Sequence, residues 1–186
     1  MISLTALWLP ILLSAVFVFI ISSVMHMVFT YHNSDFKGLK NEKEVMDALR
    51  PLDLPVGEFV FPYAKDNKER QTEEHKEKLN KGPVAFINVF PNGQPSMGAS
   101  LIQWFLYSVI ISLFSGYVAA EALIGQSDYL SVFRFVGTTA FMGYSFALLQ
   151  NSIWYKRPWS TTLKSVFDGL IYGLITAGTF GWLWPA

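Results

Sequence analysis

The stretch LTALWLPILLSAVFVFIISSVMHMVFT, residues 4–30, decides the class of fold, because it contains no Asp, Glu, Lys or Arg. A helix of about 20 apolar residues is long enough to cross the hydrocarbon core of a bilayer. The run is far longer than the apolar region of a cleaved signal peptide, which has about 7–15 residues, and no Lys or Arg precedes it. We therefore predict a retained transmembrane helix over residues 4–30.

Three further segments without charged residues, 82–120, 135–155 and 169–186, extend the same interpretation along the chain. They predict transmembrane helices at 99–122, 131–153 and 162–184. Only 15% of the 186 residues are charged, whereas a typical soluble domain has about 25%. The predicted fold is an all-α membrane protein, a four-transmembrane-helix bundle with a small α+β segment between helices 1 and 2. The corresponding domains are residues 1–30, 31–98 and 99–186.

The distribution of Lys and Arg predicts how the bundle is oriented. Near the predicted span ends, one side carries Lys37, Lys40, Lys43, Arg50, Lys81, Lys156, Arg157 and Lys164, and the other carries only Arg134. Basic residues are enriched in cytoplasmic loops. We therefore expect residues 31–98 to be cytoplasmic and both chain termini to lie outside.

Three of the four spans carry small residues at every fourth position. The stripes are Ser108, Ser112, Gly116 and Ala120; Thr139, Gly143 and Ala147; and Gly169, Gly173, Ala177 and Gly181. Small residues four apart let helix backbones approach closely, which is a main source of helix association in lipid. The stripes predict a tightly packed bundle with little room for a wide pore.

The 31–98 segment has the pattern of a small α+β module. Asn41 is a candidate N-cap for a short helix that ends at Pro51. The apolar runs 57–64 and 82–91 predict two strands. Between them, DNKERQTEEHKEKLN (residues 66–80) has almost no apolar stripe, which is typical of a solvated helix or a mobile loop.

Polar residues in or beside the spans are the candidate functional residues, because such residues are costly in a bilayer. The candidate cluster at the cytoplasmic end is His26, Gln103, Gln150, Asn151, Lys164 and Asp168, and the outer-side cluster is Glu121, Asp128 and Arg134. Lys164 and Asp168 are spaced for a mutual i, i+4 ion pair. Arg134 is expected to extend toward the outer interface or to pair with Glu121 or Asp128.

His26 lies about one turn inside the predicted cytoplasmic boundary. A structural hydrogen bond to a neighbouring helix is the favoured interpretation, with metal or haem ligation and proton handling as alternatives. His26 and His32 are six residues apart, which on a continuous helix places them about 120° from a common face. The chain has three histidines and no cysteine, and neither HxxxH nor HExxH occurs. We predict no metal, no cofactor and no catalytic residue.

Three stretches resemble a known group of proteins. HNSDF (32–36), GPVAF (82–86) and PWSTTLKSVFDGLIYGLITAGTFGWLWP (158–185) are similar to segments of small bacterial integral membrane proteins that are described only as hypothetical. The resemblance spans most of the chain. It implies a complete unit in the bacterial cytoplasmic membrane, and it implies no activity, ligand or site residue.

The sequence favours a non-enzymatic integral membrane protein that acts as an accessory or assembly subunit of a larger membrane complex. The expected partners are the lipid bilayer and other membrane protein subunits or further copies of this chain. The balanced charge, 14 basic against 14 acidic residues, does not favour nucleic acid. The alternatives are a small oligomeric transporter or channel with a cytoplasmic-side polar vestibule and, third, a haem- or metal-binding membrane protein.

Overall fold

The computed structural model describes residues 2–125 and 128–185. The chain divides into two compact units. One unit comprises residues 1–36 and 96–186 and is called the bundle below. The other comprises residues 37–95 and is called the insert. The division leaves residues 31–36 and 96–98 with the bundle, whereas the sequence interpretation had grouped them with the segment between the first two spans.

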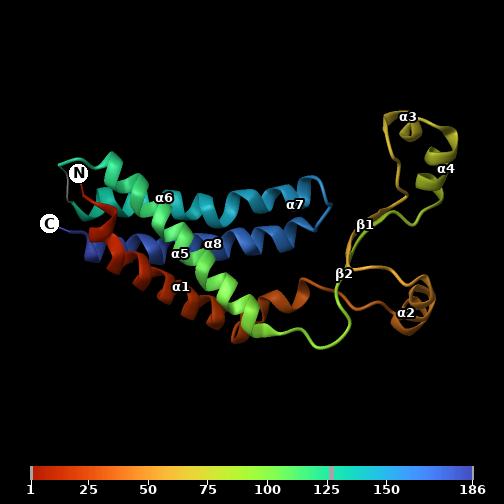
Figure 1. The fold of residues 1–186 in the computed structure, drawn as a ribbon, viewed down its shortest axis with the longest axis horizontal. Coiled ribbons are helices and arrows are strands. Elements are labelled where there is room, and N and C mark those ends of the chain that lie inside the picture. Colours follow the sequence, from red (N-terminus) through yellow and green to blue (C-terminus); the bar gives the residue numbers. More distant parts are fainter. Residues whose placement is uncertain (1, 126–127, 186) are drawn as a thin grey trace. The chain divides into compact units, whose positions relative to one another are not determined.

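The bundle contains four helical segments that are long and apolar enough to cross a membrane, as the sequence predicted. They are η1 (Leu4–Leu7) with α1 (Trp8–Met27); α5 (Met97–Ala122); α6 (Tyr129–Ser145), which continues through η4 (Phe146–Leu148) into α7 (Leu149–Ile153); and α8 (Trp159–Leu183). The start of α1, the end of α8 and the α5–α6 turn lie at one end of the bundle (Figure 1). The end of α1 and the start of α8 therefore lie together at the opposite end.

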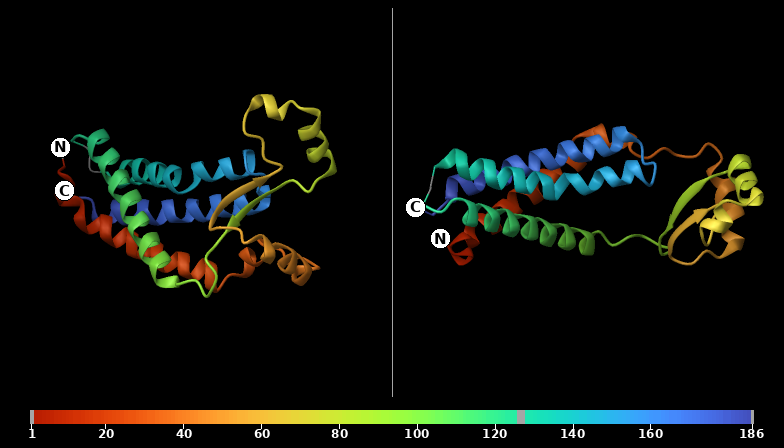
Figure 2. Two further views of the ribbon diagram at one scale, coloured as in Figure 1. Left: turned by 45° about the vertical axis from the view of Figure 1, so that its right-hand side comes forward. Right: turned by 90° about the horizontal axis from the view of Figure 1, so that it is seen from above.

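Helices α6 and α8 form the closest pair in the bundle and run side by side in all views (Figures 1 and 2). A side-chain carbon added at Gly173 would lie 3.1 Å from the Phe141 backbone nitrogen, and one added at Gly137 would lie 2.9 Å from Ala177 Cβ. Gly169 is more crowded still, by the Ser145 hydroxyl. The predicted stripe on α8 is thus the surface that α6 packs against, because only glycine and alanine allow this approach.

Helix α5 uses its predicted stripe to pack against its neighbours. Ser108, Ser112, Gly116 and Ala120 are all buried. Ser14 Oγ of α1 donates to Ser112 Oγ at 2.9 Å, so that a polar contact joins two fully buried side chains. Such interhelical hydrogen bonds contribute about 0.6 kcal/mol on average in a membrane protein.

The stripe predicted for the third span is not the buried face of α6. The buried positions are Val132, Val136, Ala140, Tyr144 and Ser145. Of the predicted residues, Gly143 does meet a helix, since a carbon added there would lie 2.6 Å from Ile111 Cδ1 of α5, but Ala147 is exposed. The prediction of this face was wrong because α6 buries Ala140 and Tyr144, one position further along the helix than the predicted Thr139 and Gly143, and approaches α8 through Gly137.

The insert contains α2 (Glu42–Leu49), η3 (Arg50–Leu52), β1 (Gly57–Phe61), α3 (Asn67–Arg70), α4 (Glu73–Lys81) and β2 (Ala85–Val89). The strands pair antiparallel, with Phe59 opposite Ile87. The charged stretch forms two short helices, because the Asp66 and Thr72 side chains cap their N-termini. The expected cap at α2 is absent, since Asn41 donates to the Glu44 side chain instead, at 2.8 Å.

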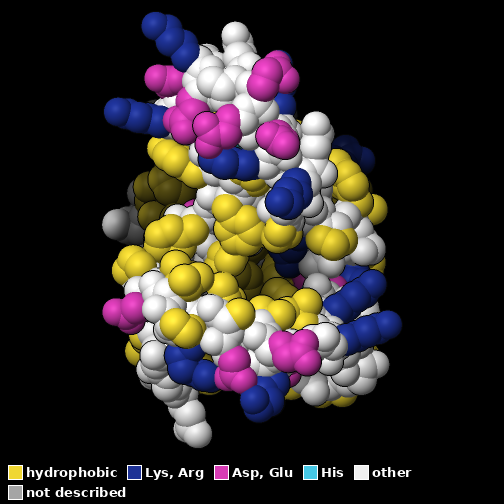
Figure 3. Space-filling model, turned by 90° about the vertical axis from the view of Figure 1, so that its right-hand side faces the viewer, with side chains coloured by type: hydrophobic (Ala, Val, Ile, Leu, Met, Phe, Trp, Pro, Cys, Tyr) yellow, Lys and Arg dark blue, Asp and Glu magenta, His cyan; other side chains and the backbone are white. Residues whose placement is uncertain are grey.

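The insert has almost no core of its own. Among its residues, only Ala64 and His75 are buried. Leu52, Val56 and Phe90 are each more than 60% exposed, at 62%, 63% and 72%. Figure 3, which looks onto the insert, shows yellow apolar side chains at the surface beside the blue and magenta charged ones.

Candidate functional site

The candidate site begins where α1 ends. Met27 is the last residue of α1, Phe29 is extended, and a short 3-10 helix, η2 (Thr30–Ser34), follows. This break brings His32 back over the last turn of α1, where its ring stacks on the His26 ring with centroids 4.5 Å apart and planes 10° from parallel. The prediction that the two histidines face different directions was wrong, because α1 ends at Met27 and does not continue to residue 32.

His32 joins two carboxylates that are far apart in the sequence. Its Nε2 lies 2.8 Å from Asp168 Oδ2 of α8, and its Nδ1 lies 2.6 Å from Asp35 Oδ2. The Asp168 and Asp35 side chains are only 5% and 6% exposed. The Tyr31 hydroxyl donates to the other Asp168 oxygen, Oδ1. His32 can donate to both carboxylates only as an imidazolium ion.

Lys164 closes this group into a ring of contacts. Its Nζ donates to the Tyr31 carbonyl oxygen at 2.5 Å, to Ser34 Oγ at 2.7 Å and to Asp35 Oδ1 at 2.9 Å. The predicted Lys164–Asp168 ion pair was wrong, because each residue finds its partner in the segment after α1. We call Tyr31, His32, Asp35, Lys164 and Asp168 the ionic ring.

The ring shifts the proton affinities of two residues at its edge. Burial alone would raise the pKa of Asp35, but the hydrogen bonds from His32 and Lys164 outweigh it and hold that pKa below its ordinary value. Burial, followed by the hydrogen bond to Asp168, raises the pKa of Tyr31. Asp35 is therefore a carboxylate and Tyr31 a hydroxyl donor at neutral pH.

His26 lies beside the ionic ring but outside it. Its Nδ1 donates to the Ser22 carbonyl oxygen at 3.0 Å, within its own helix. The Trp104 indole of α5 donates to Ser22 Oγ at 2.8 Å. A cavity of about 250 Å³ between α1 and α5 reaches this point, and it is lined by Ser22, Ser23, His26, Met27, Met97, Leu101 and Trp104. His26 is thus accessible, whereas Asp168 is buried.

The structure brings together only part of the predicted cytoplasmic-end cluster. His26 and Asp168 both contact His32, and Lys164 joins the same group through Asp35. Within the described chain, Gln103, Gln150 and Asn151 make no side-chain hydrogen bond to His26, Lys164 or Asp168. The prediction missed Tyr31, Asp35 and the direct role of His32. The polar run YHNSD directly after an apolar helix was the signal that could have indicated them.

The predicted outer-side residues do not form one cluster. Asp128 caps α6 by accepting from the backbone nitrogens of Leu130 and Ser131. Hydrogen bonds from Ser131, with a smaller contribution from the Arg134 charge, lower the pKa of Asp128. Among the residues that the structure describes, neither Glu121 nor Arg134 forms an ion pair.

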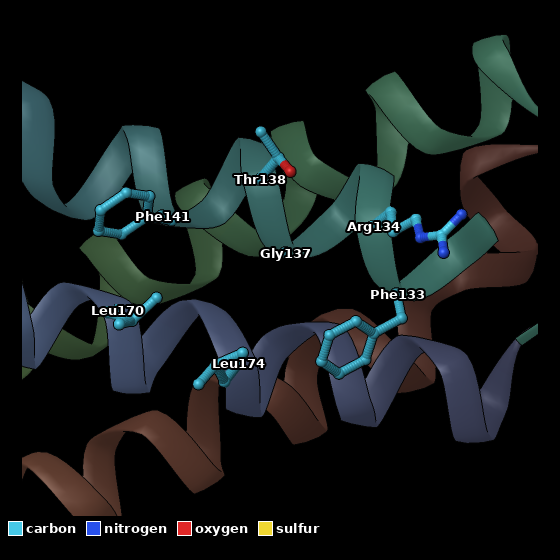
Figure 4. A pocket seen from close by; sticks show the side chains of 7 residues that line it. All are labelled: Phe133, Arg134, Gly137, Thr138, Phe141, Leu170 and Leu174. Carbon is cyan, nitrogen blue, oxygen red and sulfur yellow. The ribbon is translucent and has the colours of Figure 1, made fainter. Parts of the chain in front are cut away.

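Arg134 instead borders a shallow apolar groove between α6 and α8. The groove has a volume of about 240 Å³ and is lined by Phe133, Arg134, Gly137, Thr138, Phe141, Leu170 and Leu174. Figure 4 shows Phe133 and Leu174 close together over α8, with the Arg134 guanidinium directed away from Phe141 and Leu170. The groove presents no cluster of polar groups to a ligand.

Comparison with known proteins gives no further guide to the chemistry of the ionic ring. No family model, no curated protein and no solved structure matches this chain. The resemblance to small bacterial membrane proteins stays a prediction.

Proposed function

We propose that this chain is an integral membrane protein, in the bacterial cytoplasmic membrane, that serves as an accessory or assembly subunit of a larger membrane complex. In this proposal the four apolar segments cross the bilayer, the insert lies in the cytoplasm, and both termini lie outside. The excess of Lys and Arg near the insert supports that orientation.

The observation that carries the accessory role is the exposure of apolar side chains on the insert. A unit of this size that buries only Ala64 and His75 gains little from its own hydrophobic core. Contiguous exposed apolar surface usually marks an interaction site. We therefore assign Leu52, Val56 and Phe90, which are exposed in this chain, to the surface that binds a partner subunit.

The bundle supports the same role in a different way. In the most apolar window of α5 only 11% of the residues are buried, against 44% for α8. The outer side of α5 is therefore available to lipid or to a helix of another membrane protein. The polar groups of the ionic ring, in contrast, contact one another. They fix the segment after α1 to α8.

Mild-detergent purification of the tagged full-length chain from its native membrane tests the proposal. We expect a complex whose mass by light scattering exceeds the 21.0 kDa of the chain by that of another protein. The double variant Leu52→Lys/Phe90→Lys should lose that protein while keeping the bundle folded, because exposed substitutions cost about 0.5 kcal/mol or less. The exposed substitution Glu77→Gln in the same unit is the matched control and should retain it.

A monodisperse monomer, or an oligomer of this chain alone, would contradict the accessory role. Retention of the same partner by the Leu52→Lys/Phe90→Lys variant would show that this surface of the insert does not bind the partner.

A further inference from the structure

The ionic ring and His26 together have the composition of a transition-metal site. One ring nitrogen each from His26 and His32 and one carboxylate oxygen of Asp168 all lie within 4.8 Å of one another. Two imidazoles and a carboxylate form the ligand set of several zinc and non-haem iron sites. We propose that His26, His32 and Asp168 bind a divalent transition-metal ion, in the class of Zn²⁺ or Fe²⁺.

The hydrogen bonds around these three residues match what a metal site requires. Metal-binding histidines commonly donate the second ring N–H to a carbonyl or carboxylate, which fixes the other nitrogen as the ligand. His26 Nδ1 is directed at the Ser22 carbonyl oxygen and His32 Nδ1 at Asp35. The Nε2 atoms are therefore the ones that would bind a metal, with the His32 Nε2 giving up its direct contact with Asp168 Oδ2.

Asp168 is oriented in the same manner. The Tyr31 hydroxyl holds Oδ1, so that Oδ2 is the oxygen that faces His32 Nε2. A metal ion would take the place of the proton that otherwise joins His32 Nε2 and Asp168 Oδ2, at 2.8 Å. Lys164 is directed at Asp35 rather than at Asp168, so it does not compete with a metal for this oxygen.

Binding requires two local movements: His32 Nε2 and Asp168 Oδ2, now 2.8 Å apart, must separate slightly, and the His26 nitrogen must come closer to both. Zinc–nitrogen bonds are about 2.0–2.1 Å long, so two ligand atoms of one tetrahedral zinc ion lie about 3.3 Å apart. The three ligand atoms of this cluster lie within 4.8 Å of one another. The two stacked rings, with planes 10° from parallel, also hold their in-plane lone pairs in separate, nearly parallel planes. His26 must therefore tilt toward Asp168. It is free to do so, because it is exposed and borders the cavity between α1 and α5.

The role of His26 distinguishes a metal site from an ionic ring that is only structural. The ring is complete without it, so a structural cluster would not need this side chain. The proposal does not depend on the accessory role, because His26 and the ring lie in the bundle while the proposed partner surface lies in the insert. The two proposals can fail independently.

Equilibrium dialysis of the purified full-length chain in detergent, after stripping with a chelator, tests the site with Zn²⁺ as the probe. We expect one tightly held Zn²⁺ per chain, and binding weaker by at least about 100-fold in His26→Ala, since even loss of an outer hydrogen bond costs about 10–100-fold. Tyr31→Phe should weaken binding by that smaller factor. His75→Gln, which alters the one remaining histidine, is the matched control and should bind as the wild type does.

A second measurement needs no variant. In ¹⁵N-histidine-labelled protein, Zn²⁺ should shift the ring signals of two of the three histidines and leave the third unchanged. Excess Mg²⁺, which prefers oxygen ligands, should neither cause these shifts nor displace Zn²⁺. No Zn²⁺ binding, equal binding by His26→Ala, shifts that do not involve two histidines, or displacement by Mg²⁺ would each overturn the proposal.

Discussion

Replacing Gly173 by valine is expected to destabilise the bundle more than any other single substitution considered. A Cβ at this position would lie 3.1 Å from the nitrogen, 3.2 Å from the Cα and 3.2 Å from the Cβ of Phe141. These are backbone and near-backbone atoms of α6, so no side-chain rotation can make room for the valine. Overpacking costs about 1–3 kcal/mol and occasionally more. We expect the upper end of that range or beyond, because α6 and α8 must move apart along their shared face.

Gly178→Val provides the matched control, because Gly178 lies on the same helix one and a half turns away. The nearest atom to a Cβ there is the Tyr129 hydroxyl, at 4.0 Å. We expect the free energy of unfolding to change by about 0.5 kcal/mol or less. Titration of SDS into mixed micelles, followed by circular dichroism, measures both variants. Equal stability of the two would show that α6 and α8 do not pack through Gly173.

Asp168→Asn is expected to cost roughly 3 kcal/mol of stability, measured in chelator-treated protein by the same titration. The substitution keeps the size of the side chain but removes the carboxylate that Tyr31 and His32 contact. Removing one partner of a buried ion pair costs about 3–5 kcal/mol, because the remaining charges are left uncompensated. The Asp168 side chain is only 5% exposed, so solvent screens little of this effect.

Asp128→Asn makes the same chemical change at an exposed position of the same unit. Asn and Asp cap helices about equally well, so α6 should keep its N-terminal hydrogen bonds to Leu130 and Ser131. We expect a change within about 0.5 kcal/mol. If Asp168→Asn were as stable as Asp128→Asn, the ionic ring would not be what holds the segment after α1 on α8.

The elements that could be predicted from the sequence are those set by local pattern. Long charge-free runs indicated the four apolar helices, and Gly169, Gly173 and Ala177 indicated the packing face of α8. Short β-branched runs flanked by Gly and Pro indicated the β1–β2 pair. Each of these follows from side-chain polarity or size over a few turns, which a sequence displays directly.

The ionic ring could be predicted only in part, because it depends on where α1 stops. Once the chain leaves the helix after Met27, His32 and Asp35 reach residues more than 120 positions away. Spacing along a continuous helix pointed instead to a local Lys164–Asp168 pair. The prediction of the buried face of α6 was wrong for a related reason. Small residues permit close packing but do not determine which face a neighbouring helix occupies.

The most direct test of the central claim, that the chain crosses the membrane and does so with the insert in the cytoplasm, is labelling of single cysteines with a membrane-impermeant thiol reagent. The chain has no native cysteine, and the exposed positions Asn92 and Ile124 lie on either side of α5. The account predicts that Ile124→Cys is labelled in intact cells and Asn92→Cys only after permeabilisation. Labelling of both from the same side would contradict a membrane-spanning α5, and the reverse pattern would contradict the orientation.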